Sequence, residues 1–189
     1  MLSDLIVGAF TFRRDVYAKV EKDSSFTNTA WLLVTVVSLL NQLGSNAGRP
    51  FFRWLMGSII GTVFAVVGFG LACFVIAWVA KALFNANVTF EELIRTLGLA
   101  YVWQVVGFLG VLKILGPLAC LAVPVMILAW IAGVAAWLIA AKEAIDLDWA
   151  QTIVSVVVGV VVLGVVWGIS AAIIGIIGFG AAAATAALR

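Results

Sequence analysis

The chain has 189 residues, of which 65% are hydrophobic and only 11% charged, and its mean hydropathy is +1.23. A soluble domain is about half apolar and about one quarter charged, so this composition excludes both a water-soluble globular protein and a disordered one. The chain has no histidine, and Cys73 and Cys120 both lie inside apolar runs. The usual general base and the commonest neutral metal ligand are therefore missing. We expect a polytopic membrane protein that is not an enzyme, with no catalytic residue, metal site or cofactor.

Residues 1–27 form a polar arm that precedes the first long apolar stretch. Apolar residues between Leu2 and Val20 recur at roughly helical spacing, with basic residues among them, which predicts one or two amphipathic helices. Such a helix either lies in the membrane interface or packs as a solvated arm on the helix bundle, and both alternatives stay open. Tyr17 lies near a predicted span end, where amphipathic rings settle at the level of the lipid headgroups.

Five apolar stretches follow the arm. They predict an all-α bundle of about five transmembrane helices within residues 28–180, followed by a small-residue tail at 181–189. The first stretch is short, because a spanning helix needs about 20 residues. The expected spans are Asn28–Leu43, Phe51–Ala80, Thr96–Leu112, Leu118–Ala141 and Ile153–Phe179.

The links between the spans carry turn and capping signals. Residues 44–50 (GSNAGRP) are rich in the residue types that turns require. Thr89 and Glu92 have the spacing of a capping box, in which each side chain binds a free amide at the start of a helix. Gly116 and Pro117 should break the chain into a tight hairpin between the third and fourth spans.

The charged residues predict an orientation. With five spans, the N-terminal side carries seven of the 11 basic residues, which favours a cytoplasmic N-terminus. The expected location is a bacterial plasma membrane. All nine acidic residues lie on that side as well. The seven basic residues are Arg13, Arg14, Lys19, Lys22, Lys81, Arg95 and Lys142.

Polar chemistry inside the predicted spans is sparse. No carboxylate falls within a span, whereas transporters and proton pumps usually carry an ionisable residue near the membrane midplane. Gln104 is the one strongly polar side chain well inside the third span. We expect it to make an interhelical hydrogen bond rather than to contact a ligand.

Small residues recur at intervals of four in three spans. This spacing makes a flat strip on which another helix can approach closely, either from this chain or from a partner. The pattern therefore predicts helix-packing surfaces. The residues are Gly57, Gly61 and Ala65 in the second span, Ala132, Ala136 and Ala140 in the fourth, and Gly164, Gly168 and Ala172 in the fifth.

Two segments resemble prokaryotic Yip-family membrane proteins. Residues 11–43 combine a short polar arm, acidic residues, a Ser/Thr-rich cap and an alanine before an apolar helix. Residues 90–101 (FEELIRTLGLAY) resemble the family's segment that enters its third span. In that segment Phe90 is followed by an acidic–Leu pair, a basic residue and a glycine, here Glu92, Leu93, Arg95 and Gly98.

The resemblance implies a five-helix membrane module with a cytoplasmic N-terminus. For eukaryotic members it implies a role in membrane traffic through protein partners. The Asp-Leu-Tyr-Gly-Pro motif of those members is absent here, so the resemblance gives no support for binding to Rab-type GTPases.

The leading functional hypothesis is a non-enzymatic membrane scaffold or adaptor. It would associate with other membrane proteins, as a homo-oligomer or as an accessory subunit of a larger bacterial respiratory or photosynthetic complex. Its other contacts would be lipids, and no nucleic acid is expected. The alternative is a small transporter, channel or lipid-handling protein. In that case the fourth span (kinked at Pro124), Gln104 and the Gly-rich fifth span would line the transport path.

Overall fold

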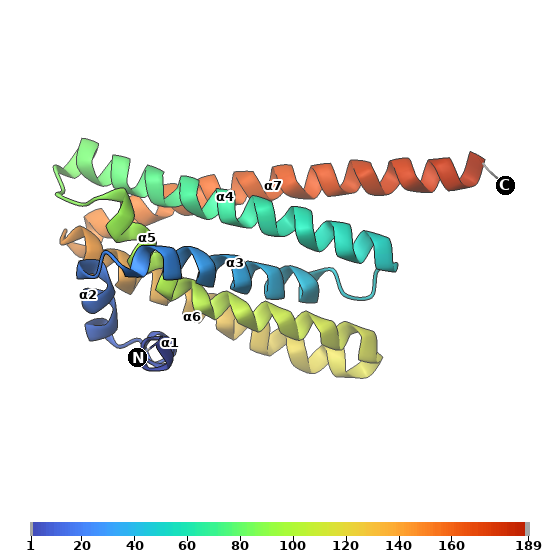
Figure 1. Cartoon of the computed structure of the whole chain (residues 1–189), viewed down its shortest axis with the longest axis horizontal. Coiled ribbons are helices and arrows are strands. Elements are labelled where there is room, and N and C mark those ends of the chain that lie inside the picture. The colour runs from blue at the N-terminus through green and yellow to red at the C-terminus, as the bar shows by residue number, and fades with distance from the viewer. Residues whose placement is uncertain (1, 188–189) are drawn as a thin grey trace.

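The computed structural model describes the backbone of residues 2–187 and the side chains of residues 2–116 and 122–176. Every regular element in this part of the chain is a helix, which confirms the all-α prediction (Figure 1). The part of the predicted tail beyond residue 187 lies outside the described residues. The elements are α1 (Leu2–Phe10), α2 (Arg14–Lys22), α3 (Phe26–Ser45), α4 (Phe51–Phe84), α5 (Phe90–Ala100), η1 (Tyr101–Leu118), α6 (Ala119–Ile145) and α7 (Trp149–Ala187).

Five of these helical segments are long and apolar enough to cross a membrane, as the sequence predicted. They are α3, α4, the continuous pair α5–η1, α6 and α7, and the observed helices extend several residues beyond most of the predicted ends. The long helices run side by side along the molecule, and the chain reverses direction at each link (Figure 1).

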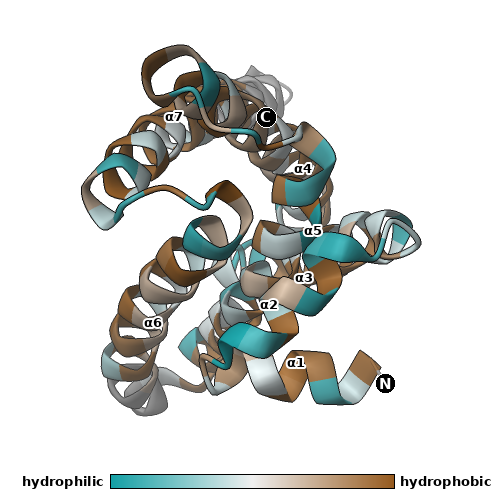
Figure 2. Cartoon of the chain, turned by 90° about the vertical axis from the view of Figure 1, so that its left-hand side faces the viewer, coloured by the Kyte–Doolittle hydropathy of each residue, from teal (hydrophilic) through white to brown (hydrophobic). Residues whose placement is uncertain are grey.

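The two ends of the bundle differ. We call the end that carries α1, α2 and the links at 85–89 and 146–148 the arm end, and the opposite end, with the turns at 46–50 and at Gly116, the far end (Figure 1). Hydrophilic residues are prominent at the arm end, which faces the viewer in Figure 2. The N-terminus lies at the arm end and the C-terminus at the far end (Figure 1).

The third span changes its helical form along its length. It begins as an α-helix whose first turn is closed by the predicted capping box: Thr89 Oγ1 accepts from the Glu92 amide at 3.2 Å, and Glu92 Oε2 accepts from the Thr89 amide at 2.7 Å. From Tyr101 the helix tightens to the 3₁₀ form. A 3₁₀ helix rises about 2.0 Å per residue, so about 15 residues cover the 30 Å of a membrane core.

The hairpin predicted after the third span is present at Gly116. This residue has φ 60° and ψ −106°, a conformation that a residue with a Cβ rarely adopts and that ends the helical run. The turn directs α6 back along η1 toward the arm end.

The buried core lies chiefly toward the arm end, where the short helices meet the spans. Phe69 of α4 is fully buried and makes edge-on ring contacts with Trp31, Tyr101 and Trp137, at centroid distances of 5.8, 5.4 and 6.1 Å. Such pairs add about 0.5–1.5 kcal/mol each beyond the area they bury. This aromatic cluster joins α3, α4, η1 and α6.

Candidate functional sites

The amphipathic arm packs on the bundle through its apolar face. Val16, Tyr17 and Val20 of α2 are almost completely buried, whereas Arg14 and Lys19 are not. The arm helix α2 is therefore packed on the bundle through its apolar face.

Arg95 fastens α2 to the bundle. Its side chain is only 6% exposed, and its guanidinium donates to the carbonyls of Val20, at 3.1 Å, and Glu21, at 3.0 Å, with a further short bond to Glu21. It also donates to Thr27 Oγ1 at 3.4 Å. The last carbonyls of a helix lack the regular helical partner, although here the Val20 carbonyl also accepts from the Asp23 amide at 3.3 Å. The negative end of the helix dipole attracts a cation. Arg95 therefore caps the C-terminus of α2.

Trp103 holds α1 in a similar way. Its indole N–H donates to the carbonyl of Ala9 at 3.2 Å, near the C-terminus of α1. Phe10 meets the indole edge-on at a centroid distance of 5.0 Å, and Phe12 stacks on it at 5.4 Å. Both arm helices are thus held at their C-terminal carbonyls by a side chain of the third span.

The remaining residues of the family-like segment serve packing and capping. Leu93 is fully buried in the core, and Phe90 lies at the surface against Phe74, at a centroid distance of 6.4 Å. A Cβ on Gly98 would lie 3.0 Å from the Cβ of Ala30, so the glycine allows α5 and α3 to approach closely.

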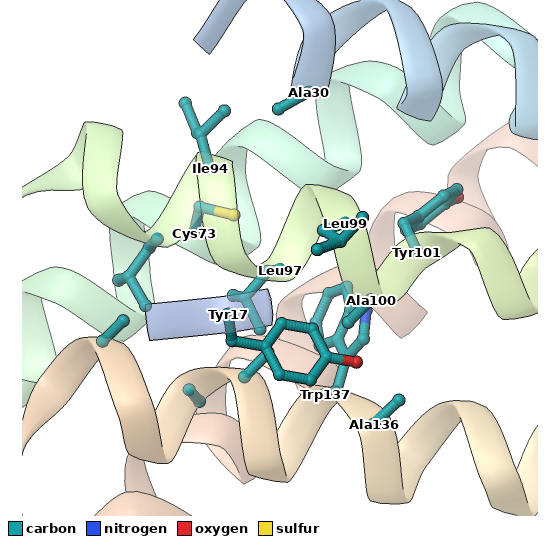
Figure 3. Packing of buried hydrophobic residues seen from close by; sticks show 14 of the residues in the cluster. Tyr17, Ala30, Cys73, Ile94, Leu97, Leu99, Ala100, Tyr101, Ala136 and Trp137 are labelled. Atoms are coloured by element: carbon teal, nitrogen blue, oxygen red, sulfur yellow. The ribbon is translucent and has the colours of Figure 1, made fainter. Parts of the chain in front are cut away.

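Tyr17 contradicts the expectation that its ring lies among the lipid headgroups. It is fully buried in the core cluster that also contains Leu97, Ala100, Ala136 and Trp137, and within the described part of the chain its hydroxyl has no hydrogen-bond partner (Figure 3). Burial disfavours the charged phenolate and raises the pKa of Tyr17 to about 12. The ring is covered because α2 turns its apolar face toward α5 and α6.

Carboxylates gather at the arm end without forming a metal site in the described part of the chain. Partial burial raises the pKa of Glu21, and the nearby charges of Asp146, Glu92 and Glu143 raise it further. Among the described residues, no group of three or more acidic or cysteine side chains could hold a metal ion. Cys73 is buried in the core, and the side chain of Cys120 lies outside the described residues.

Gln104 belongs to a polar seam between α3 and η1. The carbonyl of Gln104, rather than its side chain, accepts a hydrogen bond from Asn41 Nδ2 at 2.8 Å. One turn earlier, the hydroxyls of Ser38 and Tyr101 lie 3.3 Å apart and share a hydrogen bond. The Gln104 side chain lines a small cavity of about 220 Å³ with Trp103, Met126 and Trp130.

Glycines that the sequence analysis did not select form the next part of this seam. A Cβ on Gly110 would lie 2.5 Å from the carbonyl oxygen of Gly44, and one on Gly107 would collide with Asn41. In a 3₁₀ helix residues three apart lie above one another. Gln104, Gly107 and Gly110 therefore share one face, and their spacing of three was the signal that could have revealed it.

The glycine strip of α4 faces the end of α3. Gly57, Gly61 and Ala65 are all buried. A Cβ on Gly57 would lie 3.1 Å from Asn46 Oδ1, and one on Gly61 would lie 2.5 Å from Gln42 Oε1. The strip thus makes room for two amide side chains rather than for another helix backbone.

Close packing between α4 and α7 uses glycines outside the predicted strips. A Cβ on Gly68 would lie 3.1 Å from a methyl carbon of Val166, and one on Gly159 would collide with Ile76. On the fourth span, Ala136 is fully buried while Ala132 is partly exposed.

The predicted strip on α7 points away from the chain. Gly164, Gly168 and Ala172 are exposed, and a Cβ on either glycine would meet nothing within 4 Å. The buried residues of this part of α7, such as Leu163 and Val166, lie on the opposite side of the helix. The structure brings none of these three small residues into contact with the other predicted strips.

A larger cavity, of about 610 Å³, lies at the far end. Its lining comes from the end of α3, the following turn, the first turns of α4 and the far-end half of α7. Charged and polar lining residues include Gln42, Asn46, Arg49, Arg53 and Ser170. The sequence analysis selected none of these five, because the lining residues come from separate helices.

Comparison with known proteins identifies a family. The family model described as the Yip1 domain matches residues 7–172, which is most of the chain. No curated protein and no solved structure matches the chain.

Proposed function

This chain belongs to the Yip1 family of membrane proteins, and from this premise we propose that it is a non-enzymatic scaffold or adaptor. Its partner is another integral membrane protein, so that the chain serves as an accessory subunit of a larger bacterial assembly, such as a respiratory or photosynthetic complex. The observation that carries this proposal is the outward face of α7, with Gly164 and Gly168 at its centre.

The physical basis is the way helices associate in lipid. Apolar surface gives no net attraction there, so association depends on close van der Waals contact, which small residues allow. Within the chain, α7 packs chiefly along α4 through Gly159, Leu163 and Val166. Its other side offers two glycines with open space around them. A transmembrane helix of a partner is the occupant that would gain most from this surface.

The proposal includes a location. Most Lys and Arg residues lie at the arm end: four in the arm itself, and Lys81, Arg95 and Lys142 in or near the links. This distribution supports a cytoplasmic arm end. We propose the bacterial plasma membrane as the location, because the sequence resembles prokaryotic members of the family. The far end, with Arg49, Arg53 and Lys113, then faces away from the cytoplasm.

The experiment is purification from native membranes in a mild detergent, followed by a native gel and mass spectrometry. Wild type should migrate in a larger assembly with a fixed stoichiometry. The double variant Gly164→Ile/Gly168→Ile should migrate alone, because two branched side chains fill the space that the partner helix needs. A Cβ added at either position would meet nothing within 4 Å, so the variant should keep its fold.

Val161→Ile is the matched control. Val161 is 60% exposed on the same face of α7, and the substitution adds a methyl group without filling a glycine gap. It should leave the assembly intact. The proposal would be contradicted if the two variants migrated alike on the native gel, or if wild type migrated only as a monomer. A complex containing only this chain would identify a second copy as the occupant instead.

The far-end cavity favours a second candidate, a lipid-handling or transport protein. Liposomes that contain only this protein discriminate between the two. A scaffold should give no flux of lipid or solute above that of empty liposomes, whereas a transporter or lipid-handling protein should give flux that the Gly164→Ile/Gly168→Ile variant retains.

A further inference from the structure

We propose that the far-end cavity binds an anionic phospholipid, with the headgroup phosphate at its arginine rim and an acyl chain along its apolar wall. This inference does not depend on the scaffold proposal, because a bound lipid can be structural. The cavity lies between α4 and α7, two of the helices that are long and apolar enough to span a membrane. Its volume of about 610 Å³ is within the range of ligand sites.

The rim is positively charged. Arg49, in the turn before α4, and Arg53, in its first turn, both line the cavity and both are exposed. Among the described residues that line the cavity, two carry a guanidinium group and none carries a carboxylate. Arginine binds phosphate oxygens through paired N–H groups, and basic pockets between transmembrane helices bind anionic headgroups.

The start of α4 adds backbone donors at the same place. The helix is capped by Pro50, which provides no side-chain hydrogen bond, and its first regular backbone bond runs from the Trp54 amide to the Pro50 carbonyl at 2.9 Å. The amides of the first turn before Trp54 therefore have no partner within the helix. The N-terminus of this 34-residue helix also carries a partial positive charge that attracts anions.

The deeper wall is apolar, which distinguishes a lipid from a free phosphate. Met56 and Ile60 of α4 and Trp167 and Ile174 of α7 line the cavity. Ile60 lies seven residues after Arg53, about 10 Å further along the helix at 1.5 Å per residue. The lining is thus cationic at the rim and apolar deeper along the membrane normal. This order matches a phospholipid, whose phosphate lies at the membrane surface and whose acyl chains lie deeper.

The test is a lipid titration of the delipidated full-length protein, followed by native mass spectrometry. Phosphatidylglycerol and phosphatidylcholine with identical acyl chains are the probes. Wild type should prefer phosphatidylglycerol, and Arg49→Gln/Arg53→Gln should bind it about 30-fold more weakly, if each arginine contributes as a basic residue near an anionic surface does. Lys113→Gln removes a charge from the same end but outside the cavity, and it should change binding less than twofold.

Two further measurements identify the ligand class. Glycerol 3-phosphate, which has the charge but no acyl chain, should compete poorly with the lipid. Met56→Trp, which fills the apolar part of the cavity, should weaken lipid binding. Its melting temperature without lipid, compared with that of wild type, is the control for folding. The proposal is overturned if the two lipids bind equally, if the double arginine variant binds like Lys113→Gln, or if glycerol 3-phosphate competes as well as the lipid.

Discussion

Removing Arg95 should release the arm while leaving the bundle folded. In Arg95→Met the carbonyl of Glu21 and the hydroxyl of Thr27 lose the donors from Arg95. The carbonyl of Val20 keeps only the Asp23 amide, at 3.3 Å. Hydrogen bonds to a charged group contribute about 1.5–3 kcal/mol each, and a buried acceptor left without a partner costs about 1–3 kcal/mol. Because water can reach part of this site once α2 moves, we expect a net cost of about 3 kcal/mol for arm docking.

This cost predicts a measurable change in local opening. At 1.4 kcal/mol per factor of ten, the arm should open about 100-fold more often. Hydrogen exchange of the amides in residues 14–22, measured in detergent or nanodiscs, reports that equilibrium. Protection in those residues should fall about 100-fold in Arg95→Met and by a smaller factor in Arg95→Lys, since an ammonium group keeps the charge but lacks the planar fork that reaches two carbonyls.

Arg14→Gln provides the control. Arg14 lies on the same helix, but its Nε is 3.9 Å from Glu143 Oε1 and its side chain is 63% exposed. An exposed ion pair contributes about 0–1 kcal/mol, so protection of the arm should change by a few-fold at most. Equal protection in the Arg95→Met and Arg14→Gln variants would refute the capping argument. Equal loss of protection in the arm and in α7 would show that Arg95 supports the whole bundle rather than the arm.

Two further predictions concern the seam and the orientation. Gly107→Val should lower the melting temperature of the purified protein, because a Cβ there collides with Asn41. Gly164→Val should not lower it, because a Cβ there meets nothing within 4 Å. Similar melting temperatures of the two variants would contradict the close approach of η1 to α3. In a background without native cysteines, a cysteine at Ser24 should be shielded from an impermeant thiol reagent in intact cells and one at Ser45 should be labelled. The reverse labelling would overturn the cytoplasmic arm.

The number and order of the spans could be predicted from the sequence. Apolar composition sustained over the length of a membrane-crossing helix is a local property, and so are the capping box at Thr89 and the break at Gly116. The segment around Arg95 and Gly98 also pointed to the family that the comparison identified.

The sequence by itself therefore determined the architecture: a membrane bundle of five spans, with all carboxylates on one side and glycines at helix-packing intervals. Only the tertiary structure decided what each of these residues touches. Gly57 and Gly164 have the same spacing pattern, yet one faces Asn46 and the other faces open space. In the sequence, Arg95 is only one of the basic residues on the N-terminal side. Its role as the cap of α2 requires two segments about 75 residues apart to meet. Periodicity identifies a face of a helix, whereas its neighbour is set by how the helices pack together.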